Sequence, residues 1–184
     1  MSGVRDPVRI SATRSGRPCG PARDLQALLA DVDDAATSPG ADRGQRVAAA
    51  LLPYLGRPGL LDDDTSSGSP DRYVRHLVHC GPDYTILSLV WMPGQMSPVH
   101  AHRTWCAFGL HQGRLVESFF RNQSSGAAPL GCVQRCVGDA GHSGPGQDTA
   151  HRIANLCIQK AVSIHVYGAR YDRIGSDVNQ IWAA

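Results

Sequence analysis

The sequence predicts a mainly β fold, an antiparallel sandwich or small barrel, with α-helices at its N-terminus. From residue 72 onward, short apolar or alternating runs recur between turn residues, among them RYVRHLVHC, YTILSLVWM and AVSIHVYG. Runs of this length and spacing are typical of antiparallel sheets. Before residue 60, apolar residues instead recur at helical spacing. The 184 residues suffice for one domain with a full hydrophobic core.

The chain divides into a tail, a helical part, a loop and a β core. Residues 1–20 mix Arg, Ser, Pro and Gly without periodicity, which predicts a mobile tail; an organelle presequence is the alternative, which Asp6 disfavours. Residues 21–184 are expected to form a single domain, with helices within 21–60 and a β-barrel core at 72–170. The helices are predicted by two apolar sets: Leu25, Leu28, Leu29 and Val32, and Val47, Leu51, Leu52 and Leu55. The segment DDDTSSGSPD, residues 62–71, is predicted to be a loop.

Composition argues against several classes of function. The net charge of +2 is scattered along the chain, so no basic stripe indicates nucleic-acid binding. No run approaches the roughly 20 apolar residues of a membrane span, and no secretory signal is visible, so a soluble, cytoplasmic protein is expected. The six cysteines are dispersed, and Cys132 and Cys136 form no C-x-x-C pair, so reduced thiols are expected. We expect a monomer or a weak homo-oligomer.

The stretch GQMSPVHAHRTWCAFGLHQG holds the strongest candidate for a metal site. Residues two apart in a strand point to the same face, so His100 and His102 present both imidazoles to one side while Ala101 faces away. His151 begins a further strand-like run, HRIAN, whereas His142 lies in GHSGPG, which has turn composition. A metal ion held by histidines is the hypothesis, and histidines satisfied by ordinary hydrogen bonds are the alternative.

These residues resemble the cupin family. Its first motif has Gly, five residues, His-x-His, three or four residues, Glu, six residues and Gly; its second runs from Gly through Pro and Gly to His, with Asn after three more residues. The matching residues are Gly94, His100, His102 and Gly113, then Gly138, Pro145, Gly146, His151 and Asn155. Cys106 stands where most cupins carry a metal-binding Glu. The resemblance implies a cupin double-stranded β-helix, a small antiparallel β-barrel, whose metal is held by His100, His102 and His151, with His142 competing for the third place.

Three imidazoles without a carboxylate imply a particular kind of metal chemistry. Such a set leaves the charge of a divalent ion uncompensated and coordination positions open, which an anionic substrate would fill. Iron(II) with open positions suits a thiolate followed by dioxygen. Zinc held by three histidines is also chemically sensible.

The run SIHVYG resembles the thiol dioxygenases, the cupin subgroup that includes cysteine dioxygenase, and so favours Fe2+. It places Ser163, His165 and Tyr167 on one face of a strand, and the resemblance implies a hydrogen-bonded relay ending in a phenol beside the iron. In animal cysteine dioxygenases a cysteine is joined to that tyrosine by a thioether bond, and counting back from Gly113 puts Cys106 in its place. The segment RTWCAFG resembles bacterial members in which no such bond forms, so the alternative for Cys106 is a small buried hydrophobe.

The run RYVRHLV resembles the strand that binds the substrate carboxylate in cysteine dioxygenase. Tyr73 and Arg75 match that family's Tyr and Arg, and a guanidinium fork can hold a carboxylate by two parallel hydrogen bonds; an exposed strand arginine is the alternative. The related 3-mercaptopropionate dioxygenases carry Gln at this place. The expected function is an iron(II)-dependent thiol dioxygenase that oxidises L-cysteine with O2 to cysteine sulfinic acid. The alternatives are oxidation of another small thiol such as 3-mercaptopropionate, and metal binding by a cupin without turnover.

Overall fold

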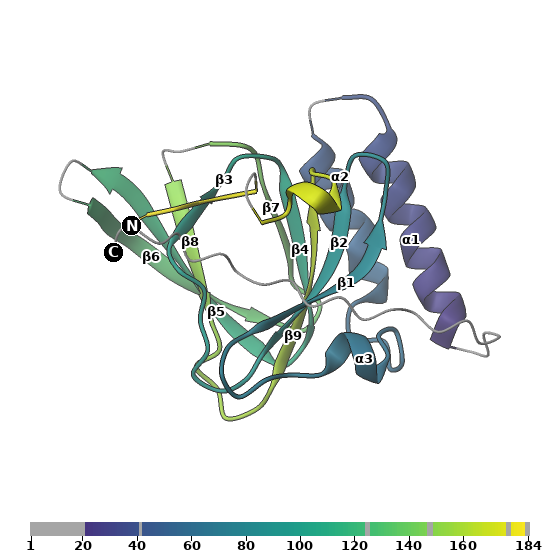
Figure 1. Cartoon of the computed structure of the whole chain (residues 1–184), viewed down its shortest axis with the longest axis horizontal. Helices are drawn as coiled ribbons and strands as arrows, with labels where there is room; N and C mark the ends of the chain where they lie inside the picture. Colours follow the sequence, from purple (N-terminus) through teal and green to yellow (C-terminus); the bar gives the residue numbers. More distant parts are fainter. Residues whose placement is uncertain (1–20, 41, 124–125, 147–148, 176–177, 183–184) are drawn as a thin grey trace.

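The computed structural model describes residues 21–40, 42–123, 126–146, 149–175 and 178–182. The predicted mobile tail, residues 1–20, lies outside these residues. Helices come first in the described chain and strands follow, as predicted (Figure 1). The helical elements are α1 (Pro21–Thr37), α2 (Arg43–Leu51), the 3-10 turn η1 (Leu52–Tyr54), α3 (Asp63–Ser66) and the 3-10 turn η2 (Tyr171–Arg173).

The strands form two five-stranded antiparallel sheets. The first sheet has the order β1-β2-β9-β4-β7 and the second has the order β10-β3-β8-β5-β6. Their bounds are β1 (Val74–Cys80), β2 (Thr85–Trp91), β3 (His100–His102), β4 (Cys106–Gln112), β5 (Arg114–Gln123), β6 (Gly126–Cys136), β7 (Ala140–Ser143), β8 (Thr149–Ala154), β9 (Ala161–Tyr167) and β10 (Asn179–Ile181). The expected mainly β fold with N-terminal helices is confirmed.

The two N-terminal helices cover the outer face of the first sheet. Leu28 and Val32 of α1, and Val47 of α2, are buried against Ile164 and Val166 of β9. This burial stabilises the helices, because isolated helices of this length are marginal in water. The outer face of this sheet is therefore buried beneath the helices.

Strand β9 shows how the sequence divides between the two faces. All seven of its residues are buried, and successive side chains of a strand alternate between faces. Ile164 and Val166 pack on the helices, so Ser163, His165 and Tyr167 point between the sheets. The predicted common face of these three residues is thus placed inside the barrel.

Three short elements differ from the sequence predictions. The expected loop at 62–71 contains α3, because the Asp62 side chain caps a single turn by accepting from the Thr65 amide at 2.8 Å. The expected turn around His142 is strand β7, which pairs with β4. Strand β10 lies beyond residue 170, where no strand was predicted, and pairs with β3. Each of these elements is too short to have a periodic signal, so local capping or a neighbouring strand decides it.

Among the described residues, no helix combines the length and the apolar character needed to span a bilayer.

Candidate metal centre

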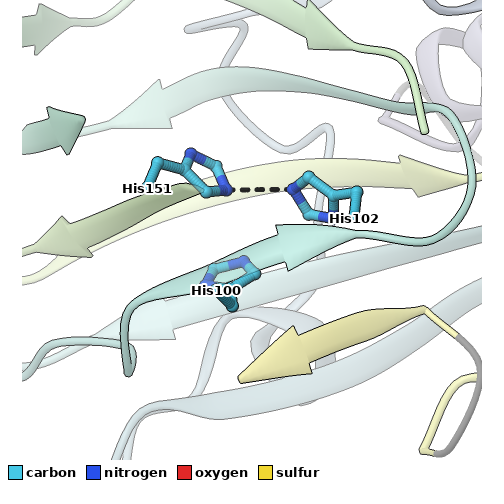
Figure 2. Close-up of side chains that lie close together, drawn as sticks. All are labelled: His100, His102 and His151. Carbon is cyan, nitrogen blue, oxygen red and sulfur yellow. Dashed lines mark hydrogen bonds between the residues drawn. The ribbon is translucent and has the colours of Figure 1, made fainter. Parts of the chain in front are cut away.

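Three histidines from two strands meet between the sheets. His100 and His102 lie on β3, and His151 lies on β8 directly opposite His100. One ring nitrogen from each residue lies within 4.8 Å of the others, and both His100 and His102 are buried. Figure 2 shows the His151 and His102 rings facing each other, with His100 beside them. Ala101, between the two β3 histidines, packs on the opposite face with Val99 and Trp182, as predicted.

The hydrogen bonds of two of these histidines determine their tautomers. His100 Nδ1 lies 3.0 Å from the Pro98 carbonyl oxygen, and His151 Nδ1 lies 2.7 Å from Glu117 Oε1. A carbonyl or an ionised carboxylate can only accept, so in both rings Nδ1 carries the hydrogen. Nε2 of each ring then has a lone pair available for a metal ion.

The spacing of the remaining nitrogen atoms fits a metal ion. His102 Nε2 lies 2.9 Å from His151 Nε2 (Figure 2). Two ligand nitrogens about 2.1 Å from one ion, at a right angle, are separated by about 3.0 Å. The pair is therefore already spaced as two neighbouring ligands of one ion. The donor set of three neutral imidazoles suits iron or zinc.

The other side of the His102 ring gives a second test of this fit. His102 Nδ1 and Asn179 Oδ1 are both buried, and neither has a hydrogen-bond partner within the part of the chain that the structure describes. The two residues are paired in the β3–β10 ladder. A metal ion on His102 Nε2 would place the ring hydrogen on Nδ1, for which Asn179 Oδ1 is a suitable acceptor.

Burial keeps His100 and His102 neutral. Burial, and next the neighbouring histidines of the cluster, lowers the pKa of His100 to about 3 and that of His102 to about 2. Neutral imidazole is the form that binds metal, so no deprotonation is needed near pH 7.

A carboxylate and an arginine form a hydrogen-bonded chain that ends at Nδ1 of His151. Glu117, on β5, accepts from His151 through Oε1 and from Arg135 Nε and Nη2 through Oε2, at 2.9 and 2.7 Å. Burial raises the pKa of Glu117, but the hydrogen bonds from His151 and Arg135 outweigh it and lower the pKa overall. Glu117 is therefore a buried anion that accepts hydrogen bonds from both partners.

The predicted Ser-His-Tyr run forms a hydrogen-bonded chain on β9. Ser163 Oγ lies 2.9 Å from His165 Nε2, and His165 Nδ1 lies 3.3 Å from the Tyr167 hydroxyl. The Trp91 indole N–H donates to Ser163 Oγ at 2.9 Å. Burial, together with nearby histidines and Arg75, lowers the pKa of His165 well below its usual value. The ring is therefore neutral and can donate on one side while accepting on the other.

Cys106 lies beside the end of this chain. It is paired with Tyr167 across the β4–β9 ladder, and both side chains are buried. Burial, and next the charge of Glu117, raises the pKa of the Cys106 thiol. A neutral, buried thiol is thus placed against the tyrosine of the relay.

The predicted substrate residues lie on the same cavity as the histidines. Tyr73 and Arg75 line a narrow cavity together with His100, His102, His151 and Tyr167. Arg75 is buried, and its Nη2 donates to the Tyr73 hydroxyl at 3.0 Å. Tyr73 stacks on Trp91, with ring centroids 4.4 Å apart. The alternative of an exposed strand arginine is therefore excluded.

A wider cavity reaches the histidines from the β6–β7 side. Its volume is about 230 Å³, and its lining includes Phe108, Phe119, Arg135 and Cys106. His142 also lines it, but that side chain is exposed and lies outside the three-histidine cluster. The structure thus brings the other candidate residues together around the three histidines and leaves His142 outside the cluster.

Four residues of the centre were missed from the sequence: Glu117, Arg135, Trp91 and Asn179. A weak signal existed for Glu117, since it shares an inward face with Leu115 in an alternating strand. Arg135 and Asn179 follow only from knowing which strands are neighbours. Such long-range pairing has no local sequence signal.

Comparison with known proteins agrees with this geometry. The sequence matches the family described as cysteine dioxygenase type I over residues 67–177, more than half of the chain. The chain belongs to this family. The cysteine dioxygenase type I match covers all three histidines, Tyr73, Arg75 and the β9 run, and it supports a dioxygenase-type enzyme that depends on a metal.

Solved structures show the fold. A protein of Klebsiella pneumoniae with a double-stranded β-helix domain is 15% identical, with 66% of this chain and 94% of the other covered and a TM-score of 0.50. A cupin superfamily protein of Desulfitobacterium hafniense is 11% identical over 56% of this chain and 83% of the other, with a TM-score of 0.44. A recombinant oxalate oxidase in complex with glycolate is 12% identical over 60% and 59%, with a TM-score of 0.45. With the two antiparallel sheets, the first likeness confirms the predicted double-stranded β-helix.

Proposed function

We propose that the protein is an iron(II)-dependent thiol dioxygenase that converts L-cysteine and O2 to cysteine sulfinic acid. The observation that carries the proposal is one cavity lined by three histidines, a buried arginine and the phenol of a hydrogen-bonded relay. Cysteine offers a thiolate for the metal and a carboxylate for the arginine. Both recognition elements of a small thiol acid are therefore available in one place.

The histidines account for the cofactor. His100, His102 and His151 would hold Fe2+ through Nε2, and the lack of a carboxylate ligand leaves room for an anion. When bound, iron(II) supplies open positions at which a thiolate and dioxygen can meet. Because Cys106 replaces the usual Glu and its thiol is neutral and buried, the substrate sulfur does not compete with a protein carboxylate.

Arg75 would orient the substrate through its carboxylate. Its guanidinium can form two parallel hydrogen bonds to a carboxylate, and the contact with Tyr73 fixes it at one edge of the cavity. Placing the carboxylate at Arg75 directs the thiol toward the histidines, which line the same cavity. Holding the reacting groups at a fixed separation lowers the barrier by proximity.

The relay would control a hydrogen at Tyr167. If Ser163 donates to His165 Nε2, the ring donates from Nδ1 to the tyrosine oxygen. The Tyr167 hydroxyl can then donate toward a group bound between the histidines and Arg75. A positioned donor of this kind stabilises developing negative charge.

Two other functions fit part of this geometry. Because 3-mercaptopropionate also carries a thiol and a carboxylate, Arg75 alone does not exclude it, although Arg rather than Gln at this position favours cysteine. A cupin that binds metal without turnover would need neither Arg75 nor the relay.

We place the enzyme in the cytoplasm, where cysteines such as Cys80 and Cys157, which form no disulfide, stay reduced.

Oxygen uptake tests the proposal. Protein purified without oxygen, loaded with Fe2+ and mixed with cysteine should consume O2 and form cysteine sulfinic acid, whereas His100→Ala should do neither. A preference for 3-mercaptopropionate would reverse the substrate assignment. Iron binding without O2 uptake on either thiol would reject the dioxygenase in favour of a metal-binding cupin.

A further inference from the structure

The three histidines of the proposed metal site include no carboxylate ligand, but a carboxylate is hydrogen-bonded to one of them. Position 106 holds a neutral thiol, whereas Glu117 holds a carboxylate 2.7 Å from His151 Nδ1. Glu117 is 4% exposed and comes from β5, a strand next to β8 in the second sheet. The structure therefore supplies a carboxylate to this site through a histidine instead of directly.

The three histidines differ in what holds their Nδ1 atoms. His100 donates to a neutral backbone carbonyl at 3.0 Å, and His102 faces the neutral amide of Asn179 across a strand ladder. Among the described residues, only His151 donates to a carboxylate. A carboxylate acceptor makes an imidazole a stronger donor to a metal than a neutral acceptor does.

Arg135 fixes the orientation of that carboxylate. Its Nε and Nη2 both donate to Oε2 of Glu117, which leaves Oε1 directed at His151. Its guanidinium carbon also lies 5.4 Å from the centre of the Phe108 ring, which itself stacks on His165 at 5.6 Å. The carboxylate is therefore held on two sides and cannot turn away from His151 without breaking a partly buried ion pair.

We infer that Glu117 is a positioning residue that, braced by Arg135, strengthens His151 as the dominant donor to the bound metal ion. It selects the Nδ1–H tautomer of His151, orients the ring, and offsets part of the charge of the ion without occupying a coordination position. The position that a carboxylate ligand would take therefore remains available to an anionic substrate. This inference rests on the proposed function only in assigning the histidines to a metal ion.

Metal binding tests the inference without any oxidation step. The dissociation constant for Co2+ is measured by competition with a chromophoric chelator, and the visible absorption of bound Co2+ is recorded. In Glu117→Gln, which keeps the shape and removes the charge, the dissociation constant should rise about 10- to 100-fold and the absorption bands should shift. Arg135→Lys, which keeps the charge but loses the fork, should weaken binding in the same direction by a smaller factor.

A matched control separates this effect from loss of a surface ion pair. Asp24→Asn breaks the exposed pair with Arg57, which is 3.0 Å long, and should leave Co2+ affinity and spectrum unchanged. Circular dichroism of the metal-free proteins checks folding. If Glu117→Gln does not fold, Glu117→Asp is measured in its place. The Asp carboxylate is one methylene too short to reach His151, so this variant should also bind Co2+ more weakly than the wild type.

Two results would overturn the inference. One is a folded Glu117→Gln, or Glu117→Asp in its place, that binds Co2+ with wild-type affinity and spectrum. The other is a loss of Co2+ affinity in Asp24→Asn as large as the loss in the Glu117 variant. Absence of O2 uptake by the wild type together with weakened Co2+ binding in Glu117→Gln would reject the proposed function and keep this inference.

Discussion

Cys106 and Tyr167 face each other across the β4–β9 ladder. In the neighbouring pair, Trp105 and Gly168, the Gly168 amide donates to the Trp105 carbonyl oxygen at 2.9 Å. Hydrogen-bonded and non-hydrogen-bonded pairs alternate along an antiparallel ladder, so Cys106 and Tyr167 form a non-hydrogen-bonded pair. Side chains of such pairs approach more closely than those of the hydrogen-bonded kind. The thiol and the phenol ring are thus placed as neighbours by strand register alone.

This register predicts a thioether bond between the two residues after turnover. Bond formation would remove the thiol hydrogen and one ring hydrogen, with two electrons passing to O2. Intact mass of the iron-loaded, cysteine-treated wild type should include a species lighter by two hydrogens. Cys106→Ala should lack that species, whereas Cys157→Ala, which removes a more exposed thiol, should retain it. A wild type of full mass after many turnovers would leave Cys106 as a buried hydrophobe.

Arg75 is predicted to control substrate binding more than turnover. Arg75→Lys keeps the charge but loses the planar fork, and a charge-assisted hydrogen bond contributes about 1.5–3 kcal/mol. We expect KM for cysteine to rise by about 10- to 100-fold in steady-state O2 uptake. Tyr73→Phe, which removes one acceptor of Arg75, should have a smaller effect. Arg57→Lys at the surface should change nothing, and an equal effect in this control would contradict the assignment.

His151 and His142 are predicted to differ in metal binding. His151→Ala removes one member of the cluster and should reduce iron from about one ion per chain to a small fraction of that value, as measured by elemental analysis after anaerobic loading. His142→Ala should retain iron, because its exposed side chain lies outside the cluster. Iron loss in the His142 variant but not in the other would exchange the two assignments.

Tyr84 is predicted to make stability depend on pH in the alkaline range. It is buried beneath α1, donates to Asp33 at 2.9 Å, and has a pKa raised by burial and by that carboxylate. Because the folded pKa is the higher one, this stabilisation is complete below the unfolded pKa of about 10 and is lost as the pH rises above it. In urea unfolding, Tyr84→Phe should cost about 1 kcal/mol near neutral pH and should flatten the decline above pH 10. Equal slopes for both proteins would refute the prediction.

The residues that could be predicted from the sequence share a strand with their partners. His100 and His102, and likewise Ser163, His165 and Tyr167, are two apart in β3 and β9, so strand periodicity alone places them on one face. The family resemblance then linked His151, Cys106 and Arg75 to them. The resemblance could do so because its motifs record positions that the fold brings together.

The residues that could not be predicted act across strands that are distant in sequence. Glu117 meets His151 because β5 lies beside β8, and Trp91 meets Ser163 because β2 lies beside β9. Sheet order follows from how the whole chain buries its apolar faces, so no local pattern contains it. Strand β7 was mistaken for a turn for the same reason, since pairing with β4 overrides the turn composition of GHSGPG, with which the strand overlaps.

Oxidation of cysteine under 18O2 shows whether the protein is a thiol dioxygenase. Protein loaded with Fe2+ is supplied with cysteine and 18O2, and the product is analysed by mass spectrometry. We expect cysteine sulfinic acid with both sulfinate oxygens labelled, and no product from a His100→Ala control. Cystine as the sole product, or sulfinate oxygens derived from water, would contradict this expectation.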